Sequence, residues 1–256
     1  KELRNNKKNN PLFLTVDTNV QFLIKSELKK AMNDFNTNAA GGLLMDVESG
    51  EVLSLVSLPD FDPNTPDSML GMVGFNRVTK GVYEMGSAFK LFTTAMALDS
   101  GTVGLKDGYD TSKPIKISRF TIKDYHGKNR WLSVPEILVY SSNIGAAKMS
   151  MDVGAKAQKF YLDQLGLLQP SSIELPEVGK PQYPSRWGDI STMTISYGHG
   201  ISVSPLQLAG AVSYLVNGGR RIPLSLLKHK SSKTPVGIRV VSKRTSKQMR
   251  ELMRLA

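Results

Sequence analysis

The sequence predicts one mixed α/β domain (α+β) in which a central sheet carries helices on both faces. Three observations lead to this fold class. Two nearly continuous apolar runs, residues 42–46 and 51–57, are typical of paired strands that are covered on both faces. Several later segments repeat apolar residues at helical spacing. The 256 residues, of which 40% are hydrophobic and 21% charged, suffice for a single large domain with a filled core.

The N-terminal part of the chain is expected to build one edge of this domain. Residues 1–10 are polar and form a lead-in, and residues 11–256 form the domain. A short strand over residues 12–17 precedes a helix that ends near Phe35. The sequence Thr18-Asn19-Val20-Gln21 matches a capping box, which marks the start of that helix.

The rest of the chain alternates helices with irregular stretches. Residues 106–130 are polar and strand-prone, residues 169–190 are rich in Pro and Ser and resemble a loop, and residues 197–200 form a tight glycine turn. The remaining helices are expected at residues 87–101, 133–140, 144–153, 157–165, 204–216 and 246–256. Two of them open with capping boxes that begin at Ser133 and Ser204.

Composition excludes several classes of function. The sequence contains no cysteine, so disulfides and thiolate chemistry are impossible. The three histidines show no spacing typical of metal ligands. No apolar run approaches the ~18 residues that cross a bilayer, so any membrane anchor is expected outside this chain. The net charge of +11 is concentrated near the two ends, and no zinc, helix-turn-helix or RNA-binding pattern accompanies it, so nucleic acid binding is not expected.

The first candidate catalytic motif is Ser87-x-x-Lys90, at the start of an apolar helix that ends at Gly101. Residues three apart share a helix face, so the two side chains can touch. A serine hydroxyl needs a neighbour that takes its proton, and a lysine whose pKa is lowered by burial can do so without histidine. Free backbone N–H groups at the helix start would also stabilise an oxyanion.

The bare Ser-x-x-Lys pattern has little specificity, because it occurs three times. Ser26 and Lys29 lie in a lysine-rich helix, where a solvated face is the simpler explanation. Ser225 and Lys228 lie in a basic, loop-like segment. Only the pair at Ser87 follows a glycine and precedes a long apolar helix.

A second motif, Ser141-Ser142-Asn143, interrupts two short predicted helices. In such a break, the hydroxyl of Ser141 can relay a proton, and the amide of Asn143 can hold a substrate carbonyl. The simpler alternative is that these residues only cap the following helix.

Together the two motifs, some fifty residues apart, match the first two of three signatures of serine penicillin-binding proteins and class A β-lactamases. The flanking sequences resemble the transpeptidase domain of class B penicillin-binding proteins, and most closely its division-specific, FtsI-like branch. The stretches that carry this resemblance are residues 42–53, 57–64, 76–77, 84–87 and 197–208. The resemblance covers nearly the whole chain from about Leu12.

The resemblance implies the β-lactamase/D,D-peptidase fold, with a mostly antiparallel central sheet, and a peptidoglycan D,D-transpeptidase that needs neither metal nor cofactor. It implies that Ser87 is the nucleophile, Lys90 its general base and Ser141 a proton relay, while Asn143 binds the substrate amide. The backbone N–H of Ser87 would form half of the oxyanion hole. Glu84, near Ser87, is expected to support the turn.

The resemblance also implies the surroundings of the enzyme. Its substrates would be peptidoglycan stem peptides ending in D-Ala-D-Ala, and β-lactams would acylate the same serine. Its further partners would be membrane proteins of the division complex, and its place the bacterial inner membrane with the catalytic domain in the periplasm.

One departure concerns the third signature, Lys-Thr/Ser-Gly, which the sequence lacks. Lys233-Thr234-Pro235 resembles it, but proline replaces the glycine, so the domain is expected to be C-terminally truncated and its sheet incomplete. Two alternatives to a transpeptidase stay open here. One is a β-lactamase-like hydrolase, for which no water-activating base is evident, and the other is a non-catalytic penicillin-binding receptor or scaffold.

Overall fold

The computed structural model of the chain describes residues 11–62, 64–65, 71–117, 119–229 and 235–256. The predicted lead-in (residues 1–10) and the first two residues of the Lys233-Thr234-Pro235 sequence lie outside the described residues. The helices are α1 (Thr18–Asp34), α2 (Phe89–Asp99), α3 (Val134–Val139), α4 (Asn143–Val153), α5 (Ala155–Gln164), α6 (Asp189–Ile195), α7 (Pro205–Val216) and α8 (Lys243–Met253). Two 3₁₀ turns, η3 (Gly71–Gly74) and η4 (Gly86–Ala88), precede α2.

The strands form four short antiparallel pairs. The predicted hairpin is confirmed as β1 (Ala40–Met45) and β2 (Val52–Leu58). The predicted strand-prone excursion over residues 106–130 contains β3 (Gly108–Asp110), β4 (Ile115–Ile117) and β5 (Phe120–Ile122), and β6 (Trp131–Ser133) follows it directly. Strand β3 pairs with β6, and β4 with β5. The last pair is β7 (Arg220–Arg221) with β8 (Ile238–Arg239). Among the described residues, the expected central sheet is therefore represented by β1 and β2 alone.

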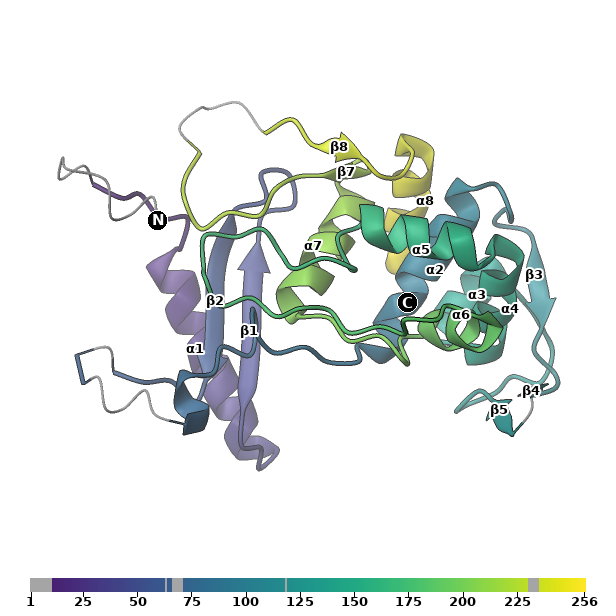
Figure 1. Cartoon of the computed structure of the whole chain (residues 1–256), viewed down its shortest axis with the longest axis horizontal. Coiled ribbons are helices and arrows are strands. Elements are labelled where there is room, and N and C mark those ends of the chain that lie inside the picture. The colour runs from purple at the N-terminus through teal and green to yellow at the C-terminus, as the bar shows by residue number, and fades with distance from the viewer. Residues whose placement is uncertain (1–10, 63, 66–70, 118, 230–234) are drawn as a thin grey trace.

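Helices lie on both faces of the β1–β2 hairpin, as the apolar runs predicted (Figure 1). On one face, the α-carbon of Gly42 approaches Ile24 and Leu28 of α1. On the other face, Val52 packs against Leu206 at the start of α7. A register shift near the turn moves Val52 onto that second face, away from α1.

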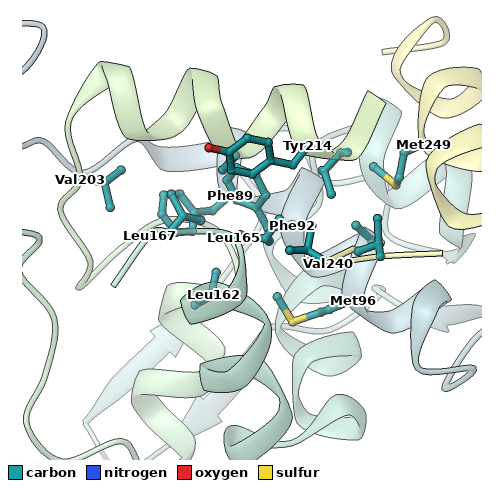
Figure 2. Packing of buried hydrophobic residues seen from close by; sticks show 14 of the residues in the cluster. Phe89, Phe92, Met96, Leu162, Leu165, Leu167, Val203, Tyr214, Val240 and Met249 are labelled. Atoms are coloured by element: carbon teal, nitrogen blue, oxygen red, sulfur yellow. The ribbon is translucent and has the colours of Figure 1, made fainter. Parts of the chain in front are cut away.

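The main hydrophobic core surrounds α2 rather than the hairpin. Phe89, Phe92 and Met96 of α2 are at most 1% exposed and pack against residues of α5, α7 and α8 (Figure 2). Phe89 and Phe92 meet edge to face, with ring centroids 5.4 Å apart. The predicted buried helix is therefore confirmed, and it ends before Gly101, which adopts a φ of +74°.

Three details of the predicted elements are wrong. Residues 12–17 form no strand, only a single bridge between Leu14 and Leu227. The cap of α1 is Asp17, whose carboxylate accepts from the N–H groups of Asn19 and Val20. Gln21 does not complete a capping box, because its amide forms hydrogen bonds with both backbone groups of Leu55 in β2 instead.

Two helices also differ from expectation. Helix α6 begins inside the predicted loop over residues 169–190. It was missed because it is short and because contacts with distant residues hold its backbone. The buried Gln158 side chain, for example, donates to the carbonyl of Thr192. Helix α8 begins three residues earlier than predicted, because Ser242 caps it through a bond from the N–H of Thr245.

Candidate active site

Ser87 and Lys90 meet at the start of α2, where η4 runs directly into the helix. The Ser87 Oγ lies 3.0 Å from the Nζ of Lys90. The two side chains differ in their surroundings: Ser87 is exposed, whereas Lys90 is 1% exposed. A reactive hydroxyl thus faces solvent while its neighbouring amine is withdrawn from water.

Ser141 comes to the same point from the break between α3 and α4. It adopts a φ of +54°, a left-handed conformation that turns the chain sharply between the two helices. Its carbonyl oxygen accepts from the Nζ of Lys90 at 2.6 Å, and its Oγ lies 2.8 Å from the same nitrogen. The Ser141 Oγ donates to the Ser87 Oγ at 2.9 Å. Two hydroxyls and one amine therefore form a closed triangle of hydrogen bonds.

Burial lowers the pKa of Lys90 to about 8, against the opposing effect of the negative charge of Asp124. A free lysine is almost wholly protonated at neutral pH, and a protonated amine cannot accept a proton. With a pKa of about 8, roughly a tenth of the Lys90 side chains are neutral at pH 7 and about half at pH 8. The Nζ can therefore act as a general base toward the Ser87 hydroxyl.

Asp124 is a residue of this site that the sequence reasoning missed. Its carboxylate accepts from the Oγ of Ser142 at 2.8 Å and from the backbone N–H of Ile144 at 2.9 Å. It thereby holds the first turn of α4 and the loop that carries Ser141. Asp124 follows β5, in which Ile122 packs against Ala147 of α4. No sequence motif marks Asp124, because its hydrogen bonds join two segments that lie far apart in the chain.

Asn143 is the first residue of α4 and is half-buried. Its Nδ2 donates to the carbonyl of Lys123 at 3.1 Å. The expected cap also exists, because the Ser142 Oγ accepts from the N–H of Gly145 at 2.9 Å. Ser142 thus caps the helix, whereas the predicted functional roles belong to Ser141 and Asn143. The substrate-binding role of Asn143 stays a prediction.

The predicted glycine turn over residues 197–200 packs against the start of the Ser87 turn. The Glu84 carboxylate accepts from the N–H of Gly200 at 2.8 Å and lies 2.9 Å from the Nδ1 of His199. Glu84 therefore supports the turn, as expected. A Cβ at Gly198 would lie 2.1 Å from the carbonyl oxygen of Gly86, and Gly198 has a φ of +81°. Only glycine fits this close approach.

The other two Ser-x-x-Lys pairs form no such site. Ser26 and Lys29 are both exposed on α1. The Ser225 Oγ donates to Glu174 rather than meeting Lys228. Within the described residues, no group of three or more Asp, Glu and His side chains could hold a metal ion, and no helix is long and apolar enough to cross a membrane.

Comparison with known proteins identifies the family of the chain. Residues 40–256 match the family model of the penicillin binding protein transpeptidase domain. The chain is 38% identical over 244 residues to a probable peptidoglycan D,D-transpeptidase FtsI of Caulobacter vibrioides, which covers 95% of this chain and 41% of that protein. It is 31% identical over 219 residues to the peptidoglycan D,D-transpeptidase FtsI of Escherichia coli, covering 85% of this chain and 37% of that protein.

Among solved structures, the transpeptidase domain of penicillin-binding protein 3 from Burkholderia pseudomallei superposes with a TM-score of 0.85 at 31% identity. The match covers 94% of this chain and 69% of that domain. The family model, the relatives and the structural match thus agree on one family. The chain belongs to the penicillin-binding protein transpeptidase domain family.

Proposed function

We propose that the chain carries the acyl-transfer site of a peptidoglycan D,D-transpeptidase that β-lactams inhibit. The observation that carries this proposal is the triangle of Ser87, Lys90 and Ser141, in which a buried amine contacts an exposed hydroxyl and a second hydroxyl joins both. The family membership supports the reaction class, and the relatives that share the sequence are named as D,D-transpeptidases.

In the first half-reaction, the Ser87 Oγ attacks the carbonyl carbon between two D-alanines of a stem peptide, and its proton passes to the Nζ of Lys90. A tetrahedral oxyanion forms and then collapses. The C–N bond breaks, and the leaving D-alanine amine takes a proton that passes from Lys90 through the Ser141 Oγ. The stem peptide remains as an ester on Ser87.

In the second half-reaction, an amine of a neighbouring strand attacks the ester carbonyl. Lys90 accepts the proton of this amine, and the Ser87 Oγ leaves and is reprotonated. A new peptide bond then joins the two strands. Asn143 would hold the amide of the donor peptide, and the backbone N–H of Ser87 would contribute to the oxyanion site.

This chemistry places the enzyme outside the cytoplasmic membrane, where peptidoglycan is cross-linked. We therefore propose a periplasmic catalytic domain tethered to the inner membrane, working at the septum together with division proteins. The chain spans 41% of the Caulobacter relative, so these roles belong to the whole protein rather than to the described residues.

Intact-protein mass spectrometry after incubation with a penicillin tests the proposal. Opening of the β-lactam ring expels no fragment, so an adduct with the full mass of the drug is expected on the wild-type chain. The Ser87→Ala variant should carry none, while Ser225→Ala, which alters the matched Ser-x-x-Lys pair, should be acylated normally. A wild-type chain without adduct, or an adduct that persists in Ser87→Ala, would overturn the proposal. Rapid release of hydrolysed drug would indicate a β-lactamase instead.

A further inference from the structure

Helix α8 presents a strongly basic face to solvent. Counting the C-cap residue Arg254, its exposed cations are Lys243, Arg244, Lys247, Arg250 and Arg254, and its one acidic residue, Glu251, lies on the same side of the helix. At 100° per residue, the five cations lie within a sector of about 120°. The buried residues, such as Met249 and Leu252, lie on the opposite side and pack into the core around α2. The basic face is therefore fixed in orientation by the core.

Two arginines of the adjacent strands extend this face. Arg220 of β7 and Arg239 of β8 are exposed and stand directly opposite each other in the antiparallel pair. Like charges in that position destabilise a strand pair. Figure 1 shows β7 and β8 beside α8, and only four positions separate Arg239 from Lys243. We call the five cations of α8 together with these two arginines the α8 basic surface.

The chain itself offsets little of the charge of the α8 basic surface: Glu251 supplies one negative charge against seven positive ones. None of its cations forms an ion pair with another described residue. The hydrogen bonds of its arginines go to neutral groups: Arg250 donates to the carbonyl of Val216, and Arg239 to that of Gly218. An external anion would therefore relieve repulsion that the fold leaves in place.

The chemistry of the surface favours a carboxylate polymer over the two other common polyanions. Residues 215–256 contain no Phe, Tyr or Trp. Single-stranded nucleic acids are normally bound with aromatic stacking. Peripheral membrane helices insert their own apolar face, whereas the apolar face of α8 packs into the core; Ile238 and Leu255, which are exposed nearby, lie outside the helix. Guanidinium groups, which make up five of the seven cations, pair well with carboxylates.

The position of the surface relative to Ser87 suits a long polymer. Asp99, at the far end of α2 from Ser87, accepts from the N–H of Ser242 and the Oγ1 of Thr245, both at 2.7 Å. Helix α2 alone separates its two ends by about 16 Å. The start of α8 is thus anchored about one helix length from Ser87 and is held rigidly relative to it.

We propose that the α8 basic surface binds a second stretch of the carboxylate-bearing glycopeptide polymer whose stem peptide reacts at Ser87. This inference rests on the proposed function, since that function supplies the polymer. Such a surface would hold the polymer near the enzyme between reactions. Its binding would be electrostatic and would weaken as salt is added.

A pelleting assay with insoluble peptidoglycan sacculi tests this proposal. The protein is first acylated with a penicillin, so that the catalytic site is occupied. At about 50 mM salt, we expect the Lys243→Glu/Lys247→Glu double variant to bind at least about fivefold less than wild type. The matched double variant Lys29→Glu/Lys30→Glu changes the net charge equally on exposed positions of α1 and should bind as wild type does.

Further arms identify the anion. Sacculi whose carboxylates have been amidated should lose binding to the wild-type chain. Equal losses in both double variants would overturn the proposal, as would binding to anionic lipid vesicles or to a single-stranded oligonucleotide that is as tight as binding to sacculi. The penicillin adduct, measured before pelleting, reports on the proposed function separately: a chain that is acylated but does not bind through α8 contradicts this inference alone.

Discussion

Helices α1 and α2 occupy opposite ends of the scale of burial in this molecule. Eight of the eleven residues of α2 are buried, whereas none of the seventeen residues of α1, all of them described, is buried. Phe22 of α1 is 74% exposed and Phe35, the residue that follows the helix, is 77% exposed, while Phe92 of α2 is fully buried. Lys90 stands on α2, and Ser87, which lies within hydrogen-bond distance of it, belongs to the turn η4 directly before that helix. The comparison teaches that the packed core around α2 holds the side chains of the site in position, and that α1 contributes far less to this.

The largest expected effect comes from Lys90, the buried amine of the triangle. Lys90→Ala should lower the rate of penicillin acylation by about 10²–10⁴-fold, because Ser87 loses its general base. In the wild-type chain, the rate should rise about tenfold per pH unit up to about pH 8 and level off above it, since only the neutral amine accepts a proton. A time course of adduct formation across the pH range measures both effects.

Lys148→Ala provides the matched control for this variant. Lys148 lies on α4 and donates to the carbonyl of Asp110, on the outside of the molecule. Its loss should leave both the rate and the pH profile unchanged. A flat wild-type profile between about pH 6 and pH 9 would exclude Lys90 as the base.

A pair of Phe→Ala variants tests the comparison of the two helices directly. Phe92→Ala should lower the free energy of unfolding by about 3–5 kcal/mol, because it removes a fully buried ring and leaves a cavity. Phe22→Ala deletes the same atoms from the exposed face of α1 and should change the free energy of unfolding by less than about 0.5 kcal/mol. Chemical denaturation measures both changes. Similar losses of unfolding free energy in the two variants would show that α1 contributes as much to stability as α2.

The smallest of these effects is expected for Asp124, which acts through its neighbours. Asp124→Asn should slow acylation about tenfold, because the loop of Ser141 loses charge-assisted hydrogen bonds. The midpoint of the pH profile should also move below the wild-type value, since the carboxylate favours the charged form of Lys90.

Two further variants separate charge from shape at this position. Asp124→Glu, which keeps the charge, should retain a midpoint near that of wild type. Asp152→Asn, which removes a carboxylate that accepts from Tyr109, should alter neither rate nor midpoint. An Asp124→Asn variant that is slower but keeps the wild-type midpoint would show that Asp124 only holds the loop in place.

Much of this protein could be read from local patterns. The β1–β2 hairpin, the buried helix after Ser87, the capping boxes at Ser133 and Ser204 and the turn over residues 197–200 all depend on residues close together in the chain. Alternation, helical periodicity, capping and turn chemistry act over a few residues, so a sequence displays them. The Ser-x-x-Lys spacing likewise follows from a single helical turn.

Other features depend on segments that meet only after folding. Ser141 reaches Lys90 across 51 positions, Asp124 holds α4 from a strand-rich excursion, and Glu84 meets Gly200 across 116. Local patterns could not distinguish Asp17 from Thr18 as the cap of α1, because the choice depends on Gln21 pairing with β2. The pKa of Lys90 also depends on the tertiary structure, because it is lowered only where the packed core withdraws the amine from water. The sequence around a lysine does not report how much water will surround its side chain.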